Sequence, residues 1–313
     1  MRALFLLPVV RPMQFRHLCL YRIRPEALPN LETLEAALRE QPFAPCGATE
    51  PQRVGWVPAL DDESTAYVHS GSGTGTWLVR LREQRRLLPA GVIREQLEDQ
   101  VRQIQDKEGR KLGKKEIVRL KDELMFTLLP RAFTKTGDTL ALIAPEAGLI
   151  LVGAGSLTKG ELLLNALRLA LGSLPVARPA FSAPIPAFLT AWLQGEREMP
   201  AGFTLEDACE IADEEGTVRC KGIDLVSDEI RKHLELGREV RKLALTFEDS
   251  LSFTLLPDAR LANMKLSERL SGELDSQFSG DKFENLDAEY QLWSLTLLRL
   301  LPRLLSSIGE TAS

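Results

Sequence analysis

The stretch LPAGVIREQLEDQVRQIQDKEGRKLGKKEIVRLKDELMFTLLP, residues 88–130, repeats apolar residues at helical spacing on both sides of a break. Those before the break are Ile93, Leu97, Val101 and Ile104, and those after it are Ile117, Leu120, Leu124 and Leu128. Gly109 and Gly113 form the break, and Pro130 must end the second segment because proline cannot continue a helix. The spacing therefore predicts a helical hairpin at about 90–130, with an apolar stripe on each helix.

The positive charge of an otherwise acidic chain lies in this stretch and in the residues that flank it on both sides. The chain has 313 residues, with 39 Lys plus Arg against 44 Asp plus Glu, a formal net charge of -5. Between Arg80 and Lys135 there are 15 basic and 9 acidic residues, which gives +6 there and −11 elsewhere. A basic stripe of this kind suits contacts with nucleic-acid phosphates. Charge alone leaves open a solvated helical surface with no specific partner.

The charge is densest in residues 107–121, at the expected tip of the hairpin. Its cations are Lys107, Arg110, Lys111, Lys114, Lys115, Arg119 and Lys121, and its only acids are Glu108 and Glu116. No aromatic side chain lies among them to stack on an unpaired base, so the pattern favours a duplex held through its backbone over a single strand.

Strand and helix signals alternate along the rest of the chain. Strands are expected at residues 14–23, 77–81, 139–144, 148–152, 217–221, 243–247 and 251–255. Helices are expected at residues 31–41, 157–171, 189–193, 205–212, 227–236 and 285–301, and Pro302 is expected to kink or end the last one. Hairpin turns join several of the strands, so the predicted class is α+β with mainly antiparallel sheets.

Four prolines, Pro175, Pro179, Pro184 and Pro186, mark the clearest boundary. We therefore expect an N-terminal α+β half at 13–178, which includes the hairpin, and a C-terminal α+β half at 179–313 that ends in an apolar helix. Residues 1–12 are interpreted as a disordered extension, because their apolar run is too short to span a membrane and lacks the small-residue cleavage site of a signal peptide. No membrane span is expected elsewhere.

No constellation of residues predicts an enzyme. The four cysteines, Cys19, Cys46, Cys209 and Cys220, lack zinc-like spacing and are expected to be scattered reduced thiols. The three histidines, His17, His69 and His233, are expected to be structural or exposed. The glycine-rich stretches at 70–76 and 153–160 lack the order of a phosphate loop, and the acidic runs at 61–63 and 213–215 are typical of solvated loops. We expect no catalytic residue, metal or cofactor.

Six short stretches occur in order along the chain: LYRI (20–23), PFAPCGATEPQRVGWVP (42–58), KDEL (121–124), LLPRAF (128–133), LGSLP (171–175) and KLAL (242–245). Together they resemble the RdgC family of bacterial recombination-associated proteins. The resemblance implies a curved monomer of several subdomains that closes into a two-fold dimeric ring. Such a ring encircles duplex DNA without reading its sequence and restrains recombination by RecA. It also implies a cytoplasmic, nucleoid-associated homodimer.

The expected DNA-binding residues lie mostly on the hairpin. They are Arg94, Lys107, Arg110, Lys111, Lys114, Lys115, Arg119, Arg131 and Lys221. The family often has a denser lysine run at this tip, which Gly113 interrupts here. Phe133, flanked by Arg131 and Lys135, is either buried locally or inserted into a partner, and the resemblance favours a dimer interface. The alternative function is an adaptor whose basic hairpin binds an acidic recombination or replication partner.

Overall fold

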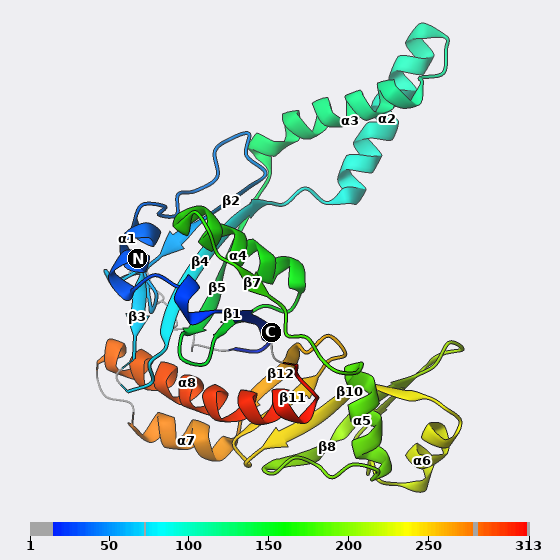
Figure 1. Cartoon of the computed structure of the whole chain (residues 1–313). Coiled ribbons are helices and arrows are strands. Elements are labelled where there is room, and N and C mark those ends of the chain that lie inside the picture. The colour runs from blue at the N-terminus through cyan, green and yellow to red at the C-terminus, as the bar shows by residue number, and fades with distance from the viewer. Residues whose placement is uncertain (1–14, 72, 278–280, 312–313) are drawn as a thin grey trace, which may run out of the picture.

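The named strands form two antiparallel sheets, shown in Figure 1, in a computed structural model that describes residues 15–71, 73–277 and 281–311. The seven-stranded sheet has the order β2-β4-β5-β6-β1-β7, with β3 also paired to β4. Its strands are β1 (Cys19–Ile23), β2 (Gln52–Val57), β3 (Val68–Ser70), β4 (Trp77–Arg86), β5 (Thr134–Ala144), β6 (Leu149–Val152) and β7 (Val176–Ala177). The α+β class with antiparallel sheets is confirmed, and the interpretation of residues 1–12 lies outside the described residues.

The second sheet has five strands in the order β12-β11-β10-β8-β9. They are β8 (Phe203–Ala212), β9 (Thr217–Lys221), β10 (Glu239–Phe247), β11 (Leu251–Leu255) and β12 (Leu261–Leu266). The α-helices are α1 (Leu31–Arg39), α2 (Ala90–Glu108), α3 (Lys114–Leu128), α4 (Leu157–Leu171), α5 (Ile185–Gln194), α6 (Asp228–Glu235), α7 (Glu268–Gln277) and α8 (Lys282–Ser307). Short 3-10 turns lie at Pro25–Ala27 (η1) and Leu129–Arg131 (η2). None of the helices in the described ranges is long and apolar enough to cross a membrane.

The central strands of the first sheet are buried on both faces, which explains their continuous apolar runs. In β6, Leu149 and Leu151 belong to the apolar cluster that contains α8, whereas Ile150 and Val152 belong to the cluster under α1 and α4. Successive side chains of a strand point to opposite faces, so a strand covered on both sides needs apolar residues at every position.

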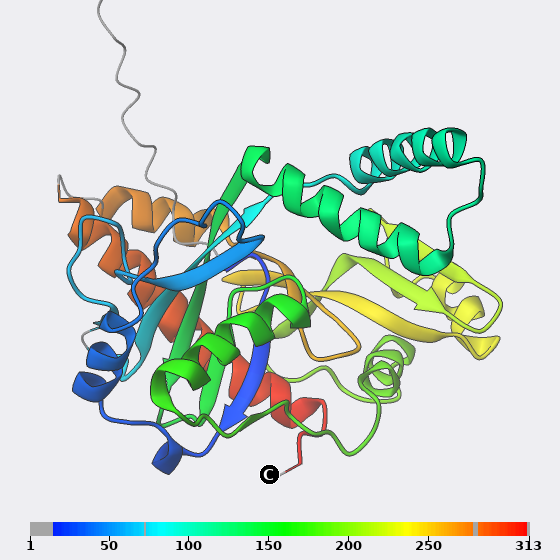
Figure 2. The same ribbon diagram turned by 90° about the horizontal axis from the view of Figure 1, so that it is seen from above.

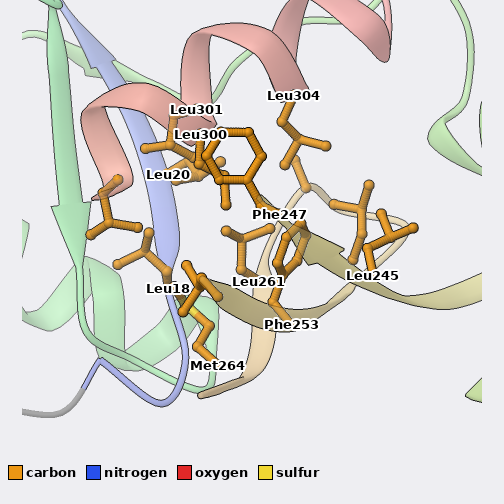
Figure 3. Packing of buried hydrophobic residues seen from close by; sticks show 14 of the residues in the cluster. Leu18, Leu20, Leu245, Phe247, Phe253, Leu261, Met264, Leu300, Leu301 and Leu304 are labelled. Carbon is orange, nitrogen blue, oxygen red and sulfur yellow. The ribbon is translucent and has the colours of Figure 1, made fainter. Parts of the chain in front are cut away.

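Helix α8 packs against both sheets at once (Figure 3). Leu300, Leu301 and Leu304 lie with Leu18 and Leu20 on the first sheet's side and with residues of β10, β11 and β12 on the other. The backbones also join directly, since Leu18 and Leu261 each donate an N–H to the other's carbonyl, at 2.8 and 3.0 Å between nitrogen and oxygen. A single apolar cluster therefore spans the two sheets.

One sequence prediction is wrong, and one of the two outcomes expected at Pro302 is excluded. Residues 205–212 form strand β8 rather than a helix, because their pairing with β10 and β9 outweighs the helix propensity of Leu205, Glu206 and Ala208. Helix α8 does not end at Pro302 but continues to Ser307. The buried turns on both sides of Pro302 offset the backbone hydrogen bond that proline cannot make.

The cysteines are free thiols, but they are not all scattered. Cys209 and Cys220 lie directly opposite each other on β8 and β9. Burial raises the pKa of the Cys209 thiol to about 12, so this thiol stays protonated near neutral pH.

The packing of α8 predicts unequal costs for one substitution at two positions of the same helix. Leu297 is fully buried, whereas Leu295 is 49% exposed. Leu297→Ala should lower the free energy of unfolding by about 2–5 kcal/mol, since it leaves a cavity against the core. Leu295→Ala should cost about 1 kcal/mol or less. Urea titrations of both variants test this, and equal losses would contradict the assigned position of α8.

Candidate nucleic-acid interface

The helical hairpin is inserted between β4 and β5, whose pairing runs without a break from Trp77 opposite Ile143 to Arg86 opposite Thr134. The N–H of Leu87 then donates to the carbonyl of Phe133 at 2.7 Å, so the ladder extends to the first residues of the insertion. Helices α2 and α3 project from this end of the ribbon, away from the body (Figure 1). The predicted hairpin at about 90–130 is confirmed.

Arg86 fixes the base of the hairpin. One guanidinium nitrogen donates to the carbonyls of Leu129 and Ala132, at 2.9 and 3.2 Å, and another donates to the carbonyl of Gly47 at 3.0 Å. Ile93, Leu124 and Leu129 are the buried residues of this region. Charged hydrogen bonds of this kind hold the C-terminal end of α3 and the loop at Gly47 to strand β4.

Two arginines on the β4–β5 ribbon are neutralised within the protein. Arg80 donates to Asp62 at 2.6 Å and to Asp138 at 3.1 Å, and Arg82 donates to the same two carboxylates at 2.7–3.0 Å. The hydrogen bonds from Arg82 and the charge of Arg80 lower the pKa of the Asp62 carboxyl. These two arginines therefore tie the loop around Asp62 to the ribbon rather than face a ligand.

The tip of the hairpin is built around Glu116. Gly109 ends α2 in the left-handed conformation, with φ 68°, and α3 begins after Gly113. The Glu116 carboxylate accepts hydrogen bonds from Arg110, at 2.7 and 3.0 Å, and from the N–H of Gly113 at 2.8 Å. Those from Arg110 contribute most to lowering the pKa of Glu116 to about 2. Arg110 also pairs with Glu108 at 2.8 Å, so its charge is largely compensated at the tip.

Most of the other predicted cations are free of internal partners. Arg94, Lys107, Lys111, Lys114, Lys115 and Arg131 are exposed, and none forms an ion pair with a carboxylate of the described residues. Arg119 pairs with Glu123 at 3.1 Å across one helical turn, on the exposed surface. A pair of this kind is worth little and leaves the arginine able to exchange partners. Free cations thus lie along the hairpin from base to tip.

Lys221 does not join the hairpin group, because it ends β9 in the second sheet. The hairpin and the part of the second sheet near α6 extend from the same side of the body in both views (Figures 1 and 2), which gives the chain a curved outline. Lys221 is exposed and has no carboxylate partner among the described residues. The predicted DNA-binding residues therefore lie on two separate parts of the molecule, the hairpin region and the second sheet.

Apolar side chains are also exposed near the cations. Phe133 is 85% exposed, so its local burial, one of two alternatives left open by the sequence, is wrong. Val118 and Phe126 are 60% and 62% exposed on α3. They stand eight residues apart and therefore share one side of the helix. The sequence prediction missed both, although their position off the Ile117–Leu120–Leu124 stripe is a signal for exposure.

The described residues contain no group of three or more His, Cys, Asp or Glu side chains placed to hold a metal ion.

Comparison with known proteins places almost the whole chain in one family. The family model described as "Putative exonuclease, RdgC" matches residues 13–311. A recombination-associated protein RdgC from Shewanella sp. (strain ANA-3) is 42% identical over 300 residues, which cover 95% of this chain and 98% of the relative. The proteins of the same name from Shewanella oneidensis and Shewanella sediminis are 42% and 40% identical over the same lengths. These relatives are named for recombination and not for an enzymatic activity.

The contacts of Arg86 predict that its loss loosens the hairpin without unfolding the body. In Arg86→Ala, the backbone amides of α2 and α3 near the base should exchange with deuterium roughly tenfold faster, as expected when opening becomes easier by about 1–2 kcal/mol. Hydrogen exchange followed by mass spectrometry measures this. Arg94→Ala, at an exposed position of α2, is the matched control and should exchange as the unaltered protein does. Equal exchange in both variants would argue against the anchor.

Proposed function

This chain belongs to the RdgC family of recombination-associated proteins, and we propose that it binds double-stranded DNA without reading the base sequence. The observation that supports this most is the row of exposed hairpin cations that have no carboxylate partner among the described residues, in a chain whose formal net charge is -5. Lysine and arginine that contact phosphates release condensed counterions, which drives binding but carries no sequence information.

We further propose that two copies close into a ring around the duplex. The curved outline supports this arrangement, since two curved chains meeting at both ends enclose a hole (Figure 1). The exposure of Phe133 at the base of the hairpin supports an apolar contact between copies, because a phenylalanine this exposed is costly to leave in water. The cations of the hairpin would line the hole, and the acidic remainder would face outward.

The proposed cellular role follows from occupying duplex DNA. A ring on the duplex would compete with RecA for the DNA that strand exchange requires, and so would restrain recombination. Such a protein would act in the cytoplasm, on the nucleoid. We assign it no catalytic residue and no cofactor.

A second candidate function is a protein adaptor. The exposed Val118 and Phe126 on α3 favour it, because apolar side chains beside cations suit an acidic, partly apolar protein surface. An adaptor would show little affinity for naked DNA at physiological salt. Gel shifts with two unrelated duplexes separate the two functions, since the DNA-binding function requires equal and substantial affinity for both.

Reversing two free cations at the tip should weaken binding to every duplex alike. In Lys111→Glu/Lys114→Glu, the affinity should fall roughly tenfold or more at about 0.1 M salt, and the slope of log affinity against log salt should become shallower by about 2. Fluorescence anisotropy with two duplexes of unrelated sequence measures both quantities.

The matched control is Lys265→Glu/Arg269→Glu, which changes the net charge equally. Lys265 lies on β12 and Arg269 on α7, neither of which belongs to the hairpin, and Figure 1 shows α7 at the edge of the body opposite the hairpin. The control should retain most of the affinity. If both double variants bind alike, or if the tip variant binds as the unaltered protein does, the hairpin is not the DNA-binding surface.

Replacing the exposed aromatic at the hairpin base should weaken self-association and leave folding intact. Phe133→Ser removes a side chain that is 85% exposed in the single chain, so the free energy of unfolding of the monomer should change by about 0.5 kcal/mol or less. Sedimentation equilibrium should show a lower dimer fraction at equal concentration. An unchanged dimer fraction would exclude Phe133 from the interface.

A further inference from the structure

One face of the β4–β5 ribbon carries two positive charges directly opposite each other. Arg85 on β4 pairs in register with Lys135 on β5. Residues opposite one another in an antiparallel pair point to the same face, with Cβ atoms about 4.5–5.5 Å apart. Both side chains are exposed, and neither forms an ion pair with a carboxylate in the part of the chain that the structure describes.

The opposite face of the same ribbon has no such charge left over. Arg80 and Arg82 share Asp62 and Asp138, and Arg86 is satisfied by backbone carbonyls. On this face Arg80 and Arg82 are thus paired with carboxylates, whereas Arg85 and Lys135 on the other face form no ion pair with a described residue. Glu83 is the nearest acid in the strand on the Arg85 side, but it lies opposite Gly137 and makes no ion pair with a described residue.

The unpaired face has an energetic cost that folding alone does not explain. Like charges placed directly opposite each other on a sheet destabilise it. This repulsion lies at the base of the hairpin. Arg85 is two residues before Leu87, whose N–H donates to the carbonyl of Phe133, and Lys135 is four residues after the exposed Arg131. An anion held between the two side chains would remove the repulsion and gain charge-assisted hydrogen bonds.

We propose that Arg85 and Lys135 form a phosphate-binding site at the base of the hairpin, which takes a backbone phosphate of the duplex that the hairpin contacts. This inference rests on the proposed function. The arginine fork can donate two parallel hydrogen bonds to a phosphodiester, and the lysine adds a point charge. The 19 residues of α2 separate this site from the hairpin tip by about 28 Å, so the tip and base would hold different phosphates.

A charge-reversal cycle tests the site, because it moves stability and DNA affinity in opposite directions. Arg85→Glu and Lys135→Glu each convert the repulsive pair into an ion pair. Each should raise the melting temperature slightly, by about 1–2 °C, while weakening duplex binding by roughly three- to tenfold. In the double variant Arg85→Glu/Lys135→Glu the like-charge pair returns, so the melting temperature should fall back toward its original value, and binding should be the weakest of the three.

The comparison with the tip variant keeps two possible failures apart. Because sites this far apart act independently, Arg85→Glu combined with Lys111→Glu/Lys114→Glu should show the product of the separate fold losses in affinity. If the ribbon variants bind DNA as the unaltered protein does while the tip variant is weakened, the ribbon site is wrong and the proposed function stands. If the unaltered protein does not bind duplex DNA, the proposed function fails and the ribbon site falls with it. Should Arg85→Glu unfold, Lys135→Glu and the neutral Arg85→Gln decide the matter by the same affinity measurement.

Discussion

The unbroken pairing of β4 with β5 is the constraint on which the rest of the structure depends. At one end of this ribbon, Leu78 and Leu142 are buried against the cluster that contains α8, and Val79 and Ala141 are buried against α1 and α4. At the other end the ladder passes beyond the core to Arg86 and Thr134. The same hydrogen-bonded register therefore builds the hydrophobic core and carries the hairpin out from it, so a rigid element positions the cations.

The β4–β5 ribbon is buried at one end and carries charged side chains toward the other. Each of its faces changes from apolar to charged along the strands, and the charged residues have different partners on the two faces. On one face, Asp62 and Asp138 form ion pairs with Arg80 and Arg82. On the other face, and on the hairpin, there are exposed cations that form no ion pair with a described residue. A chain of formal net charge -5 that concentrates positive charge at the tip of a projecting hairpin has the electrostatic form expected of a protein that attracts a polyanion.

Local patterns predicted much of the fold. The apolar run at 157–171 matches α4 residue for residue, and the two glycines located the tip between α2 and α3. The sequence predictions failed where contacts with residues far away in the sequence determine the structure. Residues 205–212 form a strand because they pair with β10, and α8 continues past Pro302 because the core packs around it. A sequence pattern that is compatible with either structure is settled by tertiary contacts.

The candidate site was predictable in position but not in detail. Counting charges located the hairpin, but it could not show that Arg110 is held by Glu116 or that Arg80 and Arg82 share two carboxylates, because these partners meet only in the folded chain. The strand register that sets Arg85 against Lys135 was equally hidden. By contrast, the structure shows that Phe133 is exposed, which excludes local burial, one of the two alternatives that the sequence had left open for this residue.

The central claim is that the unaltered protein holds duplex DNA through its phosphates alone. Its most direct test is the affinity for two duplexes of unrelated sequence, measured by anisotropy over a salt series from about 50 to 200 mM. Phosphate binding predicts superimposable lines of log affinity against log salt that fall steeply, with a slope of several units. A shallow slope, or lines that separate by sequence, would contradict the account.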